Sequence, residues 1–249
     1  MKSGELHQCW LLHARPYRES SLLLELFSRT EGRQGAIARG VRSGSKRGTS
    51  WKKSLLQPFV PLQIGLGGRG ELRTVNQLEG GGLAIVLTGE RLLAGLYLNE
   101  LLVRLLPAHE DESLLFEEYG RAVAALAGNA ELEPLLRNFE LTLLEALGYA
   151  LQLDFDANDG KPIEPGISYL LHEGGGFVRV LASAGLDAET QGIQGEVLLA
   201  MAQRDFSSLQ TRRQAKQLLR TVLQQHLGNR EIVSRSLFAR HPPTSTQQR

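Results

Sequence analysis

The sequence predicts an α+β protein in which a small five-stranded β-barrel precedes a mainly helical domain. The first 80 residues hold five short apolar segments, at 6–13, 21–28, 33–39, 55–66 and 71–78. Their roughly even spacing and the turn-forming residues between them are typical of a small antiparallel barrel. After residues 80–82, which read Gly-Gly-Gly, the apolar residues recur with the helical period, which indicates a domain boundary.

Turn signals define the ends of the barrel strands. We expect the first strand to end at His13 and residues 14–20 to form a turn, because Pro16 cannot donate to a strand ladder. In the third segment, Arg33 and Arg39 fall on one face, because strand side chains alternate. Residues 65–70 (GLGGRG) match a dinucleotide-binding fingerprint, but no helical pattern follows them. This stretch therefore predicts a glycine-rich hairpin.

The region after the boundary predicts three successive helices. Residues 90–106 are apolar on nearly all sides and should form a buried helix that ends before Pro107. A second helix is expected over 114–126. A third begins at Glu133-Pro134 and ends at Gly148, a residue type suited to the position after a helix. We expect Glu140 and Glu145 on the polar side of this third helix.

The remainder of the helical domain includes a small subdomain at 148–182. Residues 154–160 resemble the start of a calcium loop, but the sixth position lacks glycine and the twelfth lacks glutamate, so a polar loop is expected. Residues 168–180 predict a hairpin on a glycine turn, and 195–204 and 211–227 predict helices. We therefore expect a barrel domain over 1–80, a helical domain over 81–241 and a flexible tail over 242–249.

Charge is distributed unevenly, although the formal net charge is only +1. Residues 1–80 carry 13 Lys/Arg and 6 Asp/Glu, a balance of +7, and residues 201–249 carry 9 and 2, also +7. Residues 81–200 carry 6 and 19, a balance of −13. Basic ends indicate a polyanionic partner. The alternative is that basic and acidic regions face each other within the fold.

The single cysteine, Cys9, excludes an internal disulfide and a multi-cysteine zinc site, and it fits a reducing compartment. The first residues lack the apolar core of a signal peptide, and no apolar run is long enough to span a bilayer. We therefore expect a cytoplasmic protein without a membrane partner.

The strongest functional signal is the run of residues 39–53, which holds six cations, no anion, three glycines and Trp51. Such a segment on a barrel suits contact with a phosphate backbone. The predicted DNA-binding cations are Arg39, Arg42, Lys46, Arg47, Lys52 and Lys53, supported by Arg15, Arg18, Arg33, Arg69 and Arg73.

Aromatic residues divide into stacking candidates and core candidates. Trp51 and Tyr17 are expected to stack on bases, whereas Trp10, within a strand, is expected in the core. A possible second DNA track comprises Arg212, Arg213, Lys216 and Arg220, although a solvated helix face explains these four equally well.

Several stretches together resemble the RecO family of bacterial recombination mediators. They are residues 12–27 (LHARPYRESSLLLELF), 38–42 (ARGVR), 56–59 (LQPF), 95–101 (GLYLNEL), 137–141 (RNFEL), 147–149 (LGY) and 234–238 (SRSLF). Their order covers almost the whole chain.

This resemblance implies an OB-type barrel that binds single- and double-stranded DNA, and annealing of complementary strands. It also implies work with RecR to load RecA onto DNA coated by single-stranded DNA-binding protein, whose acidic tail docks on the helical domain. By position in the motif, Arg137 resembles the family's basic residue for that tail, with Arg104 as a weaker companion. Many family members carry four zinc-binding cysteines where this chain has residues 154–160, so no zinc or other cofactor is expected.

The sequence also bears on two other function classes. An enzyme needs clustered carboxylates or a nucleophile–base pair, and the histidines show no ligand spacing, so no catalytic residue is assigned. A general OB-fold protein that binds RNA or single-stranded DNA, without a recombination role, has the same charge pattern and remains the alternative.

Overall fold

The computed structural model describes residues 5–42, 50–68, 70–172, 174–180, 192–228 and 230–240. The chain divides into two compact units. The first comprises residues up to Ala130 together with those from Glu231 onward, and the second comprises Glu131–Arg230. Within the described residues, no helix is both long and apolar enough to cross a bilayer.

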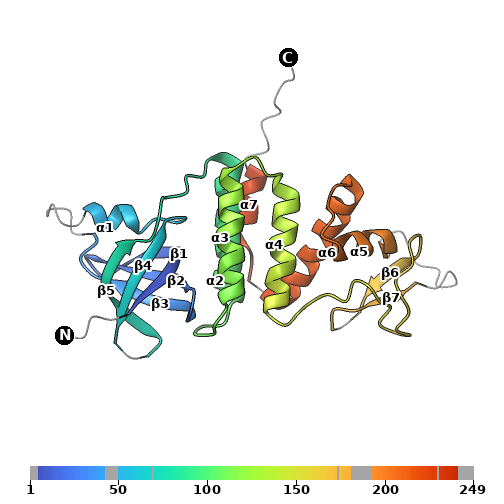
Figure 1. The fold of residues 1–249 in the computed structure, drawn as a ribbon, viewed down its shortest axis with the longest axis horizontal. Helices are drawn as coiled ribbons and strands as arrows, with labels where there is room; N and C mark the ends of the chain where they lie inside the picture. Colours follow the sequence, from blue (N-terminus) through green and yellow to red (C-terminus); the bar gives the residue numbers. More distant parts are fainter. Residues whose placement is uncertain are drawn as a thin grey trace, which may run out of the picture. The chain divides into compact units, whose positions relative to one another are not determined.

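The first unit contains a closed five-stranded barrel, as the sequence predicted (Figure 1). Its strands are β1 (Leu6–Tyr17), β2 (Ser21–Ser28), β3 (Gly32–Ala38), β4 (Pro61–Gly67) and β5 (Leu72–Gly80). They follow the order β1-β2-β3-β5-β4, and adjacent strands are antiparallel except β3 and β5, whose parallel pairing departs from the expected antiparallel barrel. The antiparallel β4–β5 pair confirms a hairpin at the glycine-rich stretch rather than a nucleotide loop.

The barrel core follows from the alternation of side chains along each strand. Leu24 lies opposite Ala36 and Leu22 opposite Ala38, so large side chains on β2 meet small ones on β3. Both alanines belong to the buried core cluster. Cys9 joins them, and burial raises the pKa of its thiol to about 12, so it stays protonated at neutral pH.

Two predicted boundaries in the barrel are wrong. β1 continues past His13 to Tyr17, and Pro16 lies opposite Leu22. Because pairing of β1 with β4 ends at Trp10, one side of β1 is open at Pro16, where a missing N–H costs little. In addition, Ser50–Leu55 forms a short helix, α1, where a loop and the start of a strand were expected.

Three helices complete the first unit: α2 (Gly89–Leu105), α3 (Ser113–Ala127) and α7 (Val233–Arg240). The first two match the predicted helices closely. Trp10 and Phe27 on the outer face of the barrel pack edge-on against Tyr119 and Phe116 of α3, with ring centroids 5.5 and 5.4 Å apart. This contact confirms Trp10 as a core residue and covers one part of the outer sheet face.

A buried polar chain joins α2, α3 and the barrel. The Tyr119 hydroxyl donates to Asn99 Oδ1 over 2.6 Å, and Asn99 Nδ2 donates to the backbone carbonyl of Leu12 over 3.0 Å. Burial raises the pKa of Tyr119, so its hydroxyl remains a donor. These bonds fix the angle at which the helices meet β1.

Helix α7 was not predicted. The Glu100 carboxylate of α2 accepts the backbone N–H groups of Val233 and Ser234, which begin α7, over 2.9 and 2.8 Å. Arg104 donates to the same carboxylate. A side chain distant in sequence therefore caps this helix, and local sequence patterns carry no sign of it.

In its described residues, the second unit contains the helices α4 (Leu132–Ala146), α5 (Gly195–Ala202) and α6 (Leu209–Leu227). A small sheet there comprises β6 (Ser168–Leu171), β7 (Phe177–Arg179) and β8 (Ile193–Gln194). The antiparallel β6–β7 pair confirms the predicted hairpin, and β8 adds a strand on the other side of β6. Gly148 follows α4 with φ of +79°, as expected of a residue after a helix end.

The prediction that Glu140 lies on the polar side of α4 is wrong, because Glu140 is only 1% exposed. It pairs with Arg137 one turn earlier, so two opposite charges are buried together. Glu145 does lie on the exposed side, where it pairs with Arg204 over 2.6 Å.

Candidate nucleic-acid interface

The outer face of β1, β2 and β3 is open at the part that α3 does not cover. Arg15 and Tyr17 of β1 alternate outward there, and Arg15 lies opposite Leu23 of β2. Leu23 in turn lies opposite Ile37 of β3, and both are only half-buried. This arrangement gives a partly apolar strip edged by an arginine and a tyrosine.

The end of the barrel at the β2–β3 turn is electrostatically balanced. Arg33 pairs with Glu25 over 2.9 Å, and Arg73 pairs with Glu31 over 2.7 Å. Arg33 also donates to the backbone carbonyl of Leu106 over 2.9 Å. Two of the arginines that the sequence suggested for DNA contact are therefore already held by carboxylates.

The opposite end carries six cations, which we term the barrel-end basic surface: Arg15, Arg18, Arg39, Arg42, Lys52 and Lys53. Among the described residues, none of the six forms an ion pair with a carboxylate. The Arg42 backbone N–H donates to the Ser20 carbonyl over 2.9 Å, and its guanidinium donates to the Arg18 carbonyl over 3.2 Å. These bonds tie the segment after β3 to the β1–β2 turn.

Two aromatic rings lie within this surface. The Arg18 guanidinium lies 5.2 Å from the centroid of Tyr17, and Lys52 Nζ lies 5.7 Å from that of Trp51. Trp51 is 46% exposed, so one face of a large ring is accessible beside cations. Aromatic rings beside cations are the combination that single-stranded nucleic-acid sites use, because bases stack while phosphates are neutralised.

A hollow of about 220 Å3 opens beside α1. Residues 35–37 of β3 pair with residues 72–74 of β5. The hollow lies between α1 and the parts of β3 and β5 that follow these paired residues. It is lined by the apolar residues Ala38, Val41, Leu56, Val75 and Leu78 and by a second group, Arg39, Trp51, Lys52, Asn76 and Gln77, which we term its rim.

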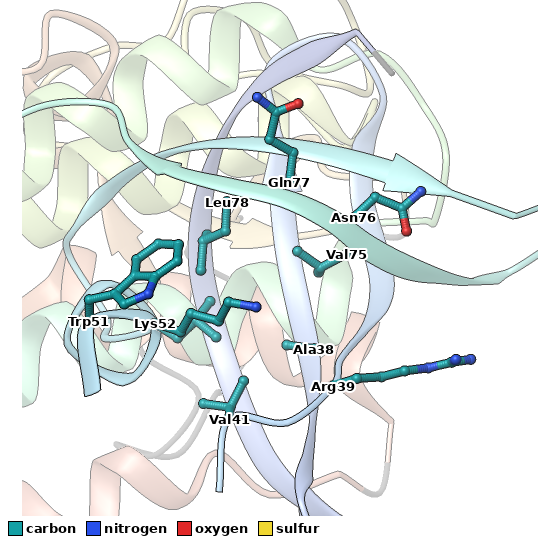
Figure 2. Close-up of a pocket in the computed structure, with 10 residues that line it drawn as sticks. Ala38, Arg39, Val41, Trp51, Lys52, Val75, Asn76, Gln77 and Leu78 are labelled. Atoms are coloured by element: carbon teal, nitrogen blue, oxygen red, sulfur yellow. The ribbon is translucent and has the colours of Figure 1, made fainter. Parts of the chain in front are cut away.

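Figure 2 shows Trp51 and Arg39 on opposite sides of this hollow, with the Lys52 side chain extending between them. The hollow and its rim residues Asn76 and Gln77 were not predicted. Their position depends on where two strands distant in sequence stop pairing, and no local pattern reports that point.

Three predicted DNA-binding residues, Lys46, Arg47 and Arg69, lie outside the part of the chain that the structure describes.

The four cations of α6 do not form a uniform surface. Arg212 pairs with Glu131 over 2.5 Å and Lys216 with Glu133 over 2.8 Å. The hydrogen bond from Lys216 lowers the pKa of Glu133, so this carboxylate stays charged. The other two cations, Arg213 and Arg220, are exposed. Half of this set thus holds α6 to the start of α4.

The two arginines suggested for tail binding are each paired within their own unit. Arg137 is only 6% exposed, and its Nη2 donates to Glu140 Oε1 over 2.6 Å. Its Nε is buried and has no hydrogen-bond partner among the described residues. Arg104 pairs with Glu100 over 2.7 Å. The Arg137 guanidinium, which the family resemblance suggested for tail binding, is therefore buried and already paired with a carboxylate.

Comparisons with known proteins identify two family models along the chain. Residues 4–81 match the family model described as Recombination protein O N terminal, and residues 87–236 match that described as Recombination protein O C terminal. The chain is 45% identical over 233 residues to the DNA repair protein RecO of Methylococcus capsulatus, an alignment that covers 94% of this chain and 92% of the relative.

Two further relatives are equally extensive matches. The DNA repair protein RecO of Pseudomonas paraeruginosa is 46% identical over 233 residues, with 92% of each chain covered. That of Cellvibrio japonicus is 42% identical over 240 residues, with 96% of this chain and 98% of the relative covered. On the strength of both family models and of these nearly full-length relatives, the chain belongs to the RecO family of DNA repair proteins.

Proposed function

We propose that this protein acts as a recombination mediator that binds single- and double-stranded DNA through the barrel-end basic surface. The observation that carries the proposal is the contrast between the two barrel ends. Arginines at one end are matched by carboxylates, whereas the six cations at the other end have no acidic partner among the described residues. Cations that are not neutralised internally are the ones that can displace counterions from a phosphate backbone.

Lys46 and Arg47 extend the proposed DNA-binding set, since they lie in sequence between Arg42 and Lys52 of this surface. Arg69 is retained in the proposed set on its charge alone. Arg33 and Arg73 contribute less, because each already contacts a glutamate. Arg213 and Arg220 form a smaller second DNA contact, with Arg212 and Lys216 retained for the α4 contact.

Annealing of complementary strands follows from the same electrostatics. Two strands repel each other through their phosphates, and a cationic surface that binds both lowers that repulsion. Sequence-independent contacts suit this task, because the bases themselves must stay available for pairing. The protein contributes no bond-breaking chemistry to this step, so binding rather than catalysis is proposed.

We further propose that the helices after the barrel bind the other proteins of recombinational DNA repair. The acidic tail of single-stranded DNA-binding protein docks at Arg137, with Arg104 as a secondary contact, and RecR assists in loading RecA. An incoming carboxylate competes with Glu140 for the Arg137 guanidinium, which can otherwise accept a second partner only through its remaining N–H groups. This competition predicts weak, salt-sensitive tail binding.

The test is charge reversal of four cations, Arg39, Arg42, Lys52 and Lys53, to glutamate. DNA affinity should fall for every sequence tried, and the slope of log affinity against log salt should flatten by about 0.7 for each lost single-strand contact, or about 3 in total. The matched control is Arg29→Glu, which changes an exposed barrel arginine that pairs with Glu117 over 3.1 Å.

Unchanged affinity in the fourfold variant, or an equal loss in the Arg29 control, would refute the assignment of DNA binding to this surface. Competition between DNA and RNA oligonucleotides of one sequence tests the alternative of a general nucleic-acid-binding protein. Annealing that proceeds without magnesium or nucleotide argues against an enzyme.

A further inference from the structure

We propose that the hollow between β3, β5 and α1 is a socket for one unstacked base of a single strand. The inference rests on the proposed DNA binding and names the chemical group that this part of the surface recognises. It separates two roles within one surface. Cations hold phosphates of any nucleic acid, whereas the socket accepts only a base that is not stacked within a duplex.

The interior of the socket is apolar. Ala38, Val41, Leu56 and Leu78 are each less than 8% exposed and form the end of the barrel core, and Val75 is half-buried beside them. At about 30 Å3 for each water, the space corresponds to roughly seven water molecules. Water above an apolar floor has few hydrogen-bond partners, so a flat aromatic ring can replace it favourably.

The rim provides the other two features that a nucleotide needs. Trp51 on α1 offers an exposed ring for stacking. Arg39 and Lys52 place positive charge at the rim, where it can contact the phosphates that flank an inserted base. Among the described residues, no carboxylate lines the hollow. This charge pattern favours a polyanion over an uncharged apolar peptide.

Amide groups at the rim make the socket tolerant of base identity. Asn76 and Gln77 lie at its edge, and each carries both a donor and an acceptor. Gln77 Nε2 already donates to Glu79 over 2.8 Å, which leaves its carbonyl oxygen for other contacts. The Asn76 amide is held over Gly67, where an added Cβ would lie 2.0 Å from Nδ2. Each base edge presents donors or acceptors that such amides can meet.

A socket of this kind gives the surface a preference for single strands. A base inside a duplex must first be unpaired and unstacked, which costs a few kcal/mol, whereas a base in a single strand is available at little cost. Only a base from single-stranded DNA then occupies the socket, whereas the surrounding cations contact the phosphates of both single- and double-stranded DNA.

The experiment compares three ligands: an oligo(dT) strand, a strand of equal length that is abasic throughout, and a duplex. The first variant, Val75→Phe, fills the hollow, and the second, Trp51→Leu, removes the stacking ring without a change of charge. Each should weaken oligo(dT) binding roughly 5- to 150-fold, the contribution of one stacked base. Affinity for the abasic strand and the duplex should change less than about twofold. Trp51→Phe, which keeps an aromatic face, should restore most of the loss.

Intrinsic fluorescence gives a second readout. The chain has two tryptophans, and the other, Trp10, is buried in the contact with α3. Oligo(dT) should quench the signal of the native protein, and this quenching should vanish in the Trp51→Phe variant. The abasic strand should quench neither.

The results separate this inference from the proposed function. Equal losses for oligo(dT) and the abasic strand, or no loss for either, would overturn the socket, and the charge-reversal result would still decide DNA binding. Should Val75→Phe fail to fold, Trp51→Leu alone decides, since its side chain is half-exposed on α1. If Trp51→Leu binds oligo(dT) as tightly as the native protein, the hollow does not bind a base. It then binds a protein side chain or no ligand.

Discussion

The buried Arg137–Glu140 pair makes a quantitative prediction about stability. The two side chains are 8% and 2% exposed, and Nη2 lies 2.6 Å from Oε1. Removal of one member leaves the other as a buried charge without its main counterion, which costs about 3–5 kcal/mol. Replacement of both by apolar groups of similar volume is often neutral, or stabilising by about 1–4 kcal/mol. We therefore expect Arg137→Ala to be much less stable than the double variant Arg137→Met with Glu140→Leu.

Urea unfolding followed by far-ultraviolet circular dichroism measures this difference. With a slope near 2 kcal/mol per molar urea, a loss of 3–5 kcal/mol lowers the midpoint by about 1.5–2.5 M. Both tryptophans, Trp10 and Trp51, belong to the first unit, so their fluorescence provides an internal reference for the half of the chain that is not mutated. Similar midpoints for Arg137→Ala and the double variant would refute the reasoning.

The expected instability of Arg137→Ala affects the test of tail binding. Loss of a tail peptide in Arg137→Ala can arise from unfolding of the second unit rather than from a lost contact. The double variant removes the guanidinium while keeping the helix packed. A tail peptide that binds the double variant as tightly as the native protein would exclude Arg137 as its contact.

Three further predictions concern the first unit. Burial raises the pKa of Glu100, but the hydrogen bonds from Ser234 and its neighbours outweigh this and lower the pKa below its usual 4.5. Because the folded pKa is the lower one, the contact stabilises the protein above pH 4.5 and is lost as pH falls, so α7 should loosen in acid and hydrogen exchange should detect it. Tyr119→Phe should cost about 1–3 kcal/mol in urea unfolding, because Asn99 loses its buried donor. Gly32→Ala should cost at least about 1–3 kcal/mol, because φ is +61° and the new Cβ would lie 1.8 Å from a backbone oxygen.

Each of these has an outcome that contradicts it. If α7 loosens at the same pH in Glu100→Gln as in the native protein, a group other than Glu100 causes the acid transition. A Tyr119→Phe protein with native stability would mean that water satisfies the Asn99 carbonyl. If Gly32→Ala unfolds at the same urea concentration as the native chain, the turn must relax more than its neighbours suggest.

Sequence reasoning succeeded where one short pattern determines structure. Alternating apolar residues placed the five strands, and helical periodicity placed α2 and α3 within a few residues of their observed ends. It failed where a distant segment decides. Pro16 is tolerated because β4 has already separated from β1, α7 depends on Glu100, and Glu140 is buried because Arg137 neutralises it.

The candidate site shows the same division. Composition alone identified the basic run and the exposed Trp51, since charge and aromatic content are local properties. It did not separate Arg33 and Arg73 from the others, because their glutamate partners are brought close only by the strand register. The hollow depends on that same register at β3 and β5.

The first unit is discontinuous in sequence, and this affects the order in which the chain matures on the ribosome. Its barrel and the helices α2 and α3 emerge early, but α7, which docks on α2, is synthesised only after the whole of the second unit. The second unit is one continuous segment, so its internal contacts can form before the first unit is complete. A chain released before Val233 leaves the Glu100 carboxylate without its two backbone donors and exposes the part of α2 that α7 otherwise covers.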